Sequence, residues 1–312
     1  MVKIRFETGW ETIGRNSVKK KSLEKQNKEA YIFMIPWFLG LLTLGIIPIC
    51  FSLYISFSSY NMMSSPKFIV FGNYIRMLQD DIFRQSLKVT FTYVFLGVPL
   101  ALLTAFIVAL ALVHPFKGVG LLRAIYYLPS LLGGSIAISV LWRIVFSQAG
   151  LINQVLLIFG IAGKSWIGDP STALYTLIIL RMWQFGSAML IFIAGMKQIP
   201  DSLYEAAEIE GAGYFVKLFR ITVPMLSPII LFNGVMNMIS AFQDFTHPYV
   251  ISGGTGGPVG STLFYSLFLY QKAFASFQMG YAAAMAWFLL IIIAFFTVIL
   301  FKSSAKRIYY EN

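Results

Sequence analysis

Six long apolar segments constrain this chain more than any other feature of its sequence. They cover approximately residues 31–57, 89–113, 122–146, 172–196, 225–245 and 280–301. Each is long enough to cross the hydrocarbon core of a bilayer, which takes about 20 residues of helix. In lipid, only an α-helix or a closed β-barrel satisfies its own backbone hydrogen bonds. We therefore interpret the segments as helices and predict an all-α integral membrane protein with six transmembrane helices.

The overall composition agrees with a membrane protein and excludes an ordinary soluble domain. Of the residues, 58% are apolar and 12% are charged, and the mean hydropathy is +0.74. Average soluble domains are much less apolar. The net charge of +11 is typical of basic flanks that orient a membrane protein. We accordingly expect no nucleic-acid partner.

The distribution of lysine and arginine predicts that both termini are cytoplasmic. With the N-terminus inside, the inner segments hold sixteen of these residues and the outer segments hold six. Cytoplasmic loops carry such an excess of positive charge. The chain then divides into a cytoplasmic tail (1–30), a six-helix domain (31–301) and a second cytoplasmic tail (302–312). The first tail is polar and lacks a cleavage-type sequence, so a signal peptide is not expected.

An acid-rich run lies in the predicted inner segment 197–224. It reads Glu205-Ala-Ala-Glu-Ile-Glu-Gly211-Ala-Gly213 and is followed by Ile221-Thr-Val-Pro224. Ser202 and Glu205 have capping-box spacing, so we predict that a short helix starts here and that Gly211 ends it in a left-handed turn.

A second short helix is predicted over 214–222, before Pro224 breaks it. On one of its sides it would carry Phe215, Leu218 and Phe219.

The acids of the first short helix share one face, since Asp201, Glu205 and Glu208 follow helical spacing. Acids near a helix N-terminus can simply complement the helix dipole. The cytoplasmic lipid surface is anionic, however, and repels an acidic stripe. A basic protein surface is therefore the better partner.

This run resembles the EAA loop of the permease subunits of type I ABC importers. The loop pattern is E-A-A, two residues, an acid, G-A, and then I-x-L-P; here Glu210 replaces the usual aspartate and Val223 the usual leucine. In that family the loop docks in a cleft of the ATP-hydrolysing subunit and carries its movement to the membrane helices. The resemblance implies that the coupling residues are Glu205, Ala206, Ala207, Glu208, Glu210, Gly211, Ala212, Phe219 and Pro224.

Other markers resemble the carbohydrate-type permeases of this class. They include Phe71-Gly-Asn-Tyr74, near which a short helix along the membrane precedes the second span, and Trp166-Ile-Gly-Asp-Pro170. A glycine-rich turn, Ser252-Gly-Gly-Thr-Gly-Gly-Pro258, either connects two helices or contacts an external binding protein. The resemblance runs from about residue 31 to residue 301 and implies the six-helix fold of a type I importer permease.

The same resemblance implies the partners of this chain. They are a second homologous permease in a heterodimer, two ATP-binding cassette subunits, an extracytoplasmic solute-binding protein, a saccharide and membrane lipid. ATP and magnesium would bind to the partner ATPase subunit, and this chain would bind no cofactor. The implied location is the bacterial cytoplasmic membrane, which the chain would cross several times.

The sequence contains no convincing catalytic set. It lacks a nucleophile elbow, a metal-binding pattern and a phosphate loop. Cys50 is the only cysteine, and His114 and His247 fall in different predicted loops. We expect a non-catalytic subunit without a metal site.

Polar residues within the apolar spans predict the substrate path. Such residues are costly in lipid and tend to face a cavity or another helix. Amide and carboxylate groups suit sugar hydroxyls, although hydrogen bonding between helices is an alternative explanation. The candidates are Trp183, Gln184, Asn233, Asn237, Gln243 and Asp244.

Arg143 and Arg181 are charges inside or at the ends of spans. They could attract the carboxylates of an acidic saccharide. They could also snorkel to the interface or pair with Asp244.

The function predicted from these observations is that of a permease subunit of a binding-protein-dependent carbohydrate importer, with an oligosaccharide as the expected substrate. It would work by alternating access, which requires a helix bundle with two states that ligand and ATP bias differently. Alternatives are a permease for glycerol phosphate or a peptide, and an ion-driven secondary transporter. The last predicts inverted repeats and paired carboxylates at mid-membrane, whereas Asp244 is the only acid placed in a predicted span.

Overall fold

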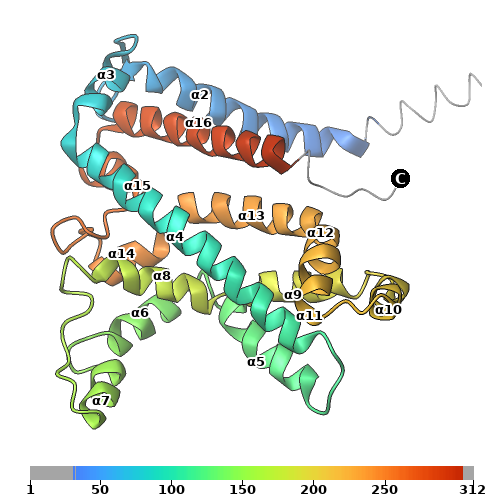
Figure 1. Ribbon diagram of the computed structural model, residues 1–312. Coiled ribbons are helices and arrows are strands. Elements are labelled where there is room, and N and C mark those ends of the chain that lie inside the picture. The colour runs from blue at the N-terminus through green and yellow to red at the C-terminus, as the bar shows by residue number, and fades with distance from the viewer. Residues whose placement is uncertain (1–30, 32, 305–312) are drawn as a thin grey trace, which may run out of the picture. The chain divides into compact units, whose positions relative to one another are not determined.

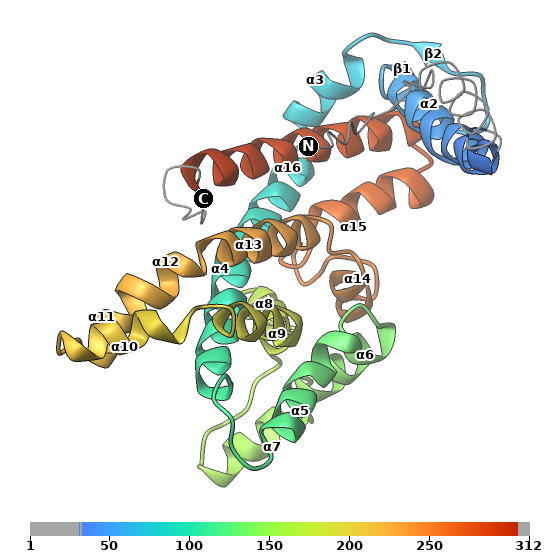
Figure 2. The same ribbon diagram turned by 90° about the vertical axis from the view of Figure 1, so that its right-hand side faces the viewer.

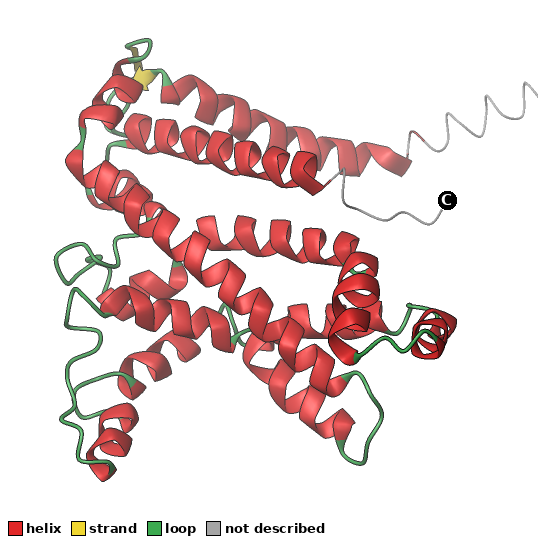
Figure 3. Ribbon diagram, in the orientation of Figure 1, coloured by secondary structure: helices red, strands yellow, loops and turns green. Residues whose placement is uncertain are grey.

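The computed structural model describes residues 31 and 33–304, and nearly all of its regular structure is helical (Figures 1 and 3). The predicted tail 1–30 lies outside the described residues, as do residues 305–312 of the predicted tail 302–312. The chain forms two units, Met1–Tyr54 and Ile55–Asn312. We describe each unit by itself.

The first unit contributes most of the helix Phe33–Ser56. A π-helical segment, η1 (Leu41–Ile46), leads into α2 (Ile47–Ser56). The wider π-helical turn ends at Ile46, two residues before Pro48, which has no backbone N–H to donate. Nearly all side chains of this helix are exposed and apolar.

The second unit contains the other elements, whose bounds are as follows. They are β1 (Ser58–Ser59), β2 (Lys67–Phe68), α3 (Gly72–Gln79), α4 (Asp81–Leu112), α5 (Val119–Leu131), α6 (Ile136–Val145), α7 (Leu151–Ile158), α8 (Ala173–Trp183), α9 (Gly186–Met196), α10 (Asp201–Ile209), α11 (Tyr214–Lys217), η2 (Leu218–Thr222), α12 (Val223–Met225), α13 (Ser227–Phe242), α14 (Thr246–Ser252), α15 (Tyr265–Tyr270), η3 (Gln271–Ala275) and α16 (Met279–Ser304). The two short strands pair antiparallel, with Ser58 opposite Phe68.

Four helical stretches of the described residues are each long and apolar enough to cross a membrane, one of them with a short interruption between α8 and α9. They are Phe33–Ser56, Asp81–Leu112, Ala173–Met196 and Met279–Ser303. Two further stretches pass only as bent pairs, namely Val119–Leu131 with Ile136–Val145, at 99°, and Tyr214–Met225 with Ser227–Ser252, at 65°. Each of the six predicted segments therefore corresponds to one of these stretches.

The third predicted span is not one helix, because it breaks sharply between α5 and α6. Pro129 lies in the last turn of α5, and Gly133 and Gly134 form the break. Ser135 then caps α6, since its Oγ accepts a hydrogen bond from the Ile138 N–H at 3.3 Å. A proline, two glycines and a serine cap in this order end one helix and begin another.

Helix α4 contacts α8, α9 and α13 and is the central element of the unit (Figures 1 and 2). Along it, Ala101, Ala105 and Ala109 recur every four residues and are buried. Ala105 and Ala109 belong to one apolar core with Met189 and Phe192 of α9. Small residues on one helix face let two backbones approach closely, which is how helices pack in a membrane.

A second close approach joins α5 to α9 at Gly186. A Cβ atom at Gly186 would lie 2.5 Å from the carbonyl oxygen of Tyr126 and 2.7 Å from the Cα of Tyr127. No side chain larger than hydrogen fits there without moving a backbone. The position of the α5–α6 break relative to α9 therefore depends on this glycine.

Asp80 anchors the start of α4. Its Oδ1 accepts a hydrogen bond from the Ile82 N–H at 2.9 Å, and its Oδ2 accepts one from the Tyr281 hydroxyl at 3.0 Å. The Lys272 ammonium lies 3.6 Å away. Burial alone would raise the pKa of Asp80, but these hydrogen bonds and the nearby cation lower it on balance. The carboxylate thus ties α4 to α16 and η3.

Candidate functional site

The acid-rich run forms α10, which begins at Asp201 directly after Pro200. The predicted capping box is wrong, because Ser202 lies inside the first turn and no side chain caps the helix. Pro200 occupies the N-cap position with an extended backbone, at φ −61° and ψ 132°. The predicted left-handed end is confirmed, with φ of +75° at Gly211.

The prediction that the second short helix ends before Pro224 is wrong. The helix continues from α11 through η2 into α12, and Pro224 occupies the first turn of α12. A proline is tolerated in a first turn because its missing N–H has no intrahelical partner there. The direction of the chain changes by 65° at Leu226 instead, between Met225 and Ser227.

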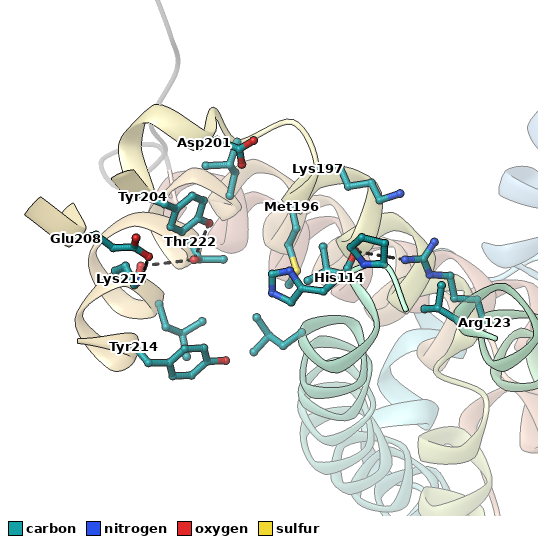
Figure 4. Close-up of a pocket in the computed structure, with 16 residues that line it drawn as sticks. His114, Arg123, Met196, Lys197, Asp201, Tyr204, Glu208, Tyr214, Lys217 and Thr222 are labelled. Carbon is teal, nitrogen blue, oxygen red and sulfur yellow. Dashed lines mark hydrogen bonds and ion pairs between the residues drawn. The ribbon is translucent and has the colours of Figure 1, made fainter. Parts of the chain in front are cut away.

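Two contacts hold α10 against the following helix (Figure 4). The Lys217 ammonium lies 2.6 Å from the Glu208 carboxylate, and the hydroxyls of Tyr204 and Thr222 lie 2.9 Å apart. Glu208 is therefore engaged within the loop. Of the predicted coupling residues, Glu205, Ala206, Glu208, Glu210, Gly211 and Phe219 are exposed, and Ala207, Ala212 and Pro224 are half-buried.

The loop also exposes several large apolar side chains. Ile209 is 89% exposed, Phe215 70% and Phe219 64%. The sequence had placed Phe215 and Phe219 on one side of their helix, and both side chains are indeed exposed.

A cavity of about 640 Å³ lies between this loop and the α4–α5 turn (Figure 4). Asp201, Tyr204 and Glu208 line it from α10, and His114 lines it from the turn. Arg123 also lines it, while its guanidinium donates to the carbonyl of Leu112 at the C-terminal end of α4. Side chains of the loop and of the α4–α5 turn thus line one common cavity.

A second cavity, of about 630 Å³, lies where three helical segments are broken. Gly133 and Gly134 contribute from the α5–α6 break, and Gln184 from the α8–α9 break. Of the six predicted path residues, four line this cavity, namely Gln184, Asn237, Gln243 and Asp244.

Two predicted path residues do not line the cavity. The Trp183 ring lies against the ring of Trp142 on α6, with centroids 5.6 Å apart. Asn233 is only 2% exposed, and its Nδ2 has no hydrogen-bond partner among the described residues. Trp183 therefore packs against α6, and Asn233 is buried outside the cavity lining.

Asp244 is the centre of a polar network at this cavity. Its Oδ2 accepts a hydrogen bond from the Tyr93 hydroxyl at 2.7 Å, and its Oδ1 lies 2.8 Å from Nδ1 of His247. Nε2 of His247 lies 2.7 Å from the Gly133 carbonyl oxygen, to which Gln184 Nε2 also donates. The network therefore links α4 and all three breaks.

His247 is the functional residue that the sequence analysis missed. We had placed it in a loop, but it lies in α14 and is 8% exposed. Its position three residues after Asp244 is the spacing of helical neighbours, which was the available signal. No group of three metal-ligating side chains occurs in the described part of the chain.

Arg181 also lines the second cavity. Its Nη2 donates to the Asn237 carbonyl at 2.5 Å, and its guanidinium lies 5.6 Å from the centre of the Tyr93 ring. Gly97 leaves room for its stem, since a Cβ there would lie 3.3 Å from the Arg181 Cδ. No ion pair within 4.0 Å joins Arg181 to Asp244, so the suggested pairing is not a direct contact, although the two opposite charges interact. Arg143, by contrast, is exposed.

The sequence matches a known family over most of its length. The family model described as "Binding-protein-dependent transport system inner membrane component" matches residues 69–309. The probable ABC transporter permease protein YesP of Bacillus subtilis (strain 168) is 48% identical, over 96% of this chain and 98% of the relative. The lactose transport system permease protein LacF of Rhizobium radiobacter is 32% identical, over 95% and 99%.

A solved structure has the same fold. It is a chain of a bacterial ABC transporter involved in the import of the acidic polysaccharide alginate, with a TM-score of 0.75 and 18% identity. The match covers 92% of this chain and 99% of that one. The likeness confirms the predicted fold of a type I importer permease.

Proposed function

This chain belongs to the family of binding-protein-dependent transport system inner membrane components, and from that membership we propose that it forms half of a saccharide path through the bacterial cytoplasmic membrane. A second, homologous permease supplies the other half. The observation that carries the proposal is the polar cavity of about 630 Å³ at the breaks of three otherwise apolar segments. Polar groups are retained inside a membrane mainly where they serve a path or a site.

Sugars fit the chemistry of this cavity. Gln184, Asn237 and Gln243 present amide groups that can donate to and accept from hydroxyls. Phe245 adds an aromatic ring to the lining. The named relatives include a lactose permease and the trehalose/maltose permease MalF of Thermococcus litoralis, the latter 30% identical over 94% of this chain. An oligosaccharide is therefore the proposed cargo.

The coupling proposal concerns α10 and the helix after it. Glu205 and Glu210 are exposed acids, and Phe219 is an exposed ring beside them in the same loop. We assign this surface to the cleft of an ATP-binding subunit, which binds ATP and magnesium. Movement of α10 would reach the membrane helices through the Lys217–Glu208 pair and the Tyr204–Thr222 contact. This places α10 and both termini on the cytoplasmic side.

The glycine-rich turn is assigned to an external solute-binding protein. It is tied to α4, since Gln85 Nε2 donates to the Val259 carbonyl at 2.8 Å, while the Val259 side chain is 83% exposed. An anchored turn with an exposed apolar tip is suited to docking. The solved relative in complex with a pentasaccharide-bound periplasmic protein has the same fold, with a TM-score of 0.78.

Glycerol phosphate is the second candidate cargo. The sn-glycerol-3-phosphate permease UgpA of Yersinia pestis is 29% identical over 79% of this chain, and Arg181 could meet a phosphate. An ion-driven transporter is disfavoured, because the cavity lining in the described residues has one carboxylate, Asp244, where that mechanism predicts a pair.

The proposal is tested in cells that contain the complete transporter. Uptake of labelled oligosaccharides is compared between the unaltered permease and Glu205→Lys, with Lys67→Glu, a charge reversal outside α10, as the control. We expect the first variant to lose uptake and to lose the ATPase subunit on purification. Normal uptake and normal co-purification in Glu205→Lys would contradict the coupling assignment, and absence of saccharide uptake in all strains would contradict the function.

A further inference from the structure

We propose that Arg181 gives the second cavity one uncompensated positive charge, and that this charge recognises a carboxylate on the transported saccharide. The inference rests on the proposed function as a saccharide permease and goes beyond it by naming the substrate class, an acidic saccharide. It is carried by the charge balance of the cavity lining and by the free donors of Arg181.

The charge balance depends on the hydrogen bonds of His247. Its Nδ1 lies 2.8 Å from an oxygen of Asp244, and its Nε2 lies 2.7 Å from the carbonyl oxygen of Gly133. The Gly133 carbonyl oxygen can only accept a hydrogen bond, and the same holds for the Asp244 carboxylate when it is ionised. Both ring nitrogens must then donate. An imidazole ring with two N–H groups is the charged form. His247 and Asp244 therefore cancel each other.

Arg181 is the remaining charged side chain in the lining given by the described residues. No carboxylate lies within 4.0 Å of its guanidinium. Each oxygen of Asp244 already forms one hydrogen bond, one with Tyr93 and the other with His247. A buried charge without a partner is costly, so a site that retains one has a ligand to offset the cost.

The guanidinium retains free donors at the cavity. Arg181 is only 9% exposed, and its Nε is fully buried without a hydrogen-bond partner. Its Nη2 donates to Asn237, and the Tyr93 hydroxyl is a further hydrogen-bond partner of the guanidinium. A guanidinium has five N–H donors in a planar fork, which matches the two oxygens of a carboxylate.

Two features of α4 hold this side chain in place. The Tyr93 ring lies under the guanidinium, at 5.6 Å from its carbon to the ring centre, and Gly97 makes room for the methylene stem. The cavity volume of about 630 Å³ is in the range that encloses a ligand larger than a single small ion. The arrangement thus suits an acidic sugar that has hydroxyls for the amides and a carboxylate for Arg181.

The test compares charged and neutral versions of the same sugar. Cells that contain the complete transporter receive one of four labelled disaccharides, each built from a different hexuronic acid. In parallel they receive the same disaccharides with the carboxyl groups reduced to alcohols. sn-Glycerol 3-phosphate is a separate arm, because a phosphate offers the same oxyanion chemistry. The permease variants are Arg181→Met, Arg181→Lys and Arg143→Met, the last a matched control at an exposed arginine. The amount of each variant in the membrane is measured.

We expect transport of at least one uronic acid disaccharide in preference to its reduced form. Arg181→Met should lower the Vmax/KM of that disaccharide by at least about tenfold, as loss of a charge-assisted hydrogen bond does. The same variant should leave a neutral sugar nearly unchanged. Arg181→Lys should retain part of the preference, and Arg143→Met should behave as wild type. Since the binding protein is the same in all strains, ratios between strains report on the permease.

Four results would overturn the inference. An equal loss for charged and neutral sugars in Arg181→Met, at equal membrane content, would mean that the arginine only supports the fold. Transport of neutral sugars alone would refute an acidic substrate and leave the saccharide permease standing. Transport of glycerol phosphate but of no uronic acid disaccharide would mean that the cavity recognises a phosphate rather than a carboxylate. Transport of none of these compounds would refute the proposed function as well.

Discussion

The hydroxyl of Tyr93 and the carboxylate of Asp244 meet at 2.7 Å, although 151 residues separate them in the chain. This hydrogen bond joins the middle of α4 to the break between α13 and α14. It also orients the carboxylate toward His247. The cavity beside it therefore depends on contacts between helices that are distant in sequence.

Removing that hydroxyl should weaken the bundle. Tyr93→Phe leaves the ring under Arg181 but removes one donor from Asp244, and loss of a buried hydrogen bond to a charged group costs about 1–3 kcal/mol. We expect a lower thermal unfolding temperature for the purified permease. Tyr175→Phe is the control, because Tyr175 is 53% exposed and should tolerate the change. Equal unfolding temperatures for both variants would show that the Tyr93–Asp244 bond contributes little.

Gly186→Ala should disturb the packing of α5 on α9. The added methyl group would meet the backbone of Tyr126 and Tyr127, so one helix must shift, and such overpacking typically costs about 1–3 kcal/mol. Gly120→Ala in α5 is the matched control, since nothing lies within 4 Å of its Cβ position. There the same substitution should be neutral or mildly stabilising. Thermal unfolding in detergent distinguishes the two, and a Gly186→Ala protein as stable as wild type would contradict the close approach.

Gly211→Val should separate coupling from folding of the bundle. A β-branched residue is a genuine outlier at the φ of +75° found at Gly211, so we expect the end of α10 to rearrange. Gly213→Val is the control, because Gly213 has an extended backbone with φ of −70° and ψ of 168°. We expect loss of the co-purified ATPase subunit for Gly211→Val only. If both variants retain it, the geometry of the turn is not needed for docking.

The charge of Asp80 should stabilise the protein above its unfolded pKa, which is about 3.9 for an aspartate. Because the folded pKa is lowered, this contribution is present above that value and is lost as the pH falls through the folded pKa. Asp80→Asn retains a capping side chain but removes the charge. The unfolding temperature of wild type should exceed that of Asp80→Asn at pH 7, and the difference should shrink as the pH falls below about 4. A difference that does not change with pH would assign the effect to hydrogen-bond geometry alone.

The sequence predicted the helical segments well, because the signal for a membrane helix is local. A run of about 20 apolar residues has one way to satisfy its backbone in lipid, and this holds whatever its neighbours are. The left-handed turn at Gly211 was predictable for the same reason, since glycine alone adopts that conformation freely. The acid-rich loop was recognisable from its own residues.

Local rules failed where two signals compete over a few residues. Ser202 has capping-box spacing to Glu205, yet the helix already begins at Asp201, with Pro200 at the N-cap position. Pro224 can break a helix, yet it lies in a first turn, where a proline is tolerated. In both cases the register of the helix decided the outcome, and register depends on the packing of the whole segment.

The sequence by itself determined which segments are long and apolar enough to cross a membrane, and it determined the residues of the acid-rich loop. The tertiary structure alone decided which polar side chains share a cavity, because Arg181, Asn237 and His247 come from three different helices. It likewise decided that the Asp244 carboxylate lies 2.8 Å from His247 and more than 4.0 Å from the Arg181 guanidinium. Hydropathy depends on each residue and its near neighbours, whereas charge pairing depends on distances of a few ångströms across helix interfaces.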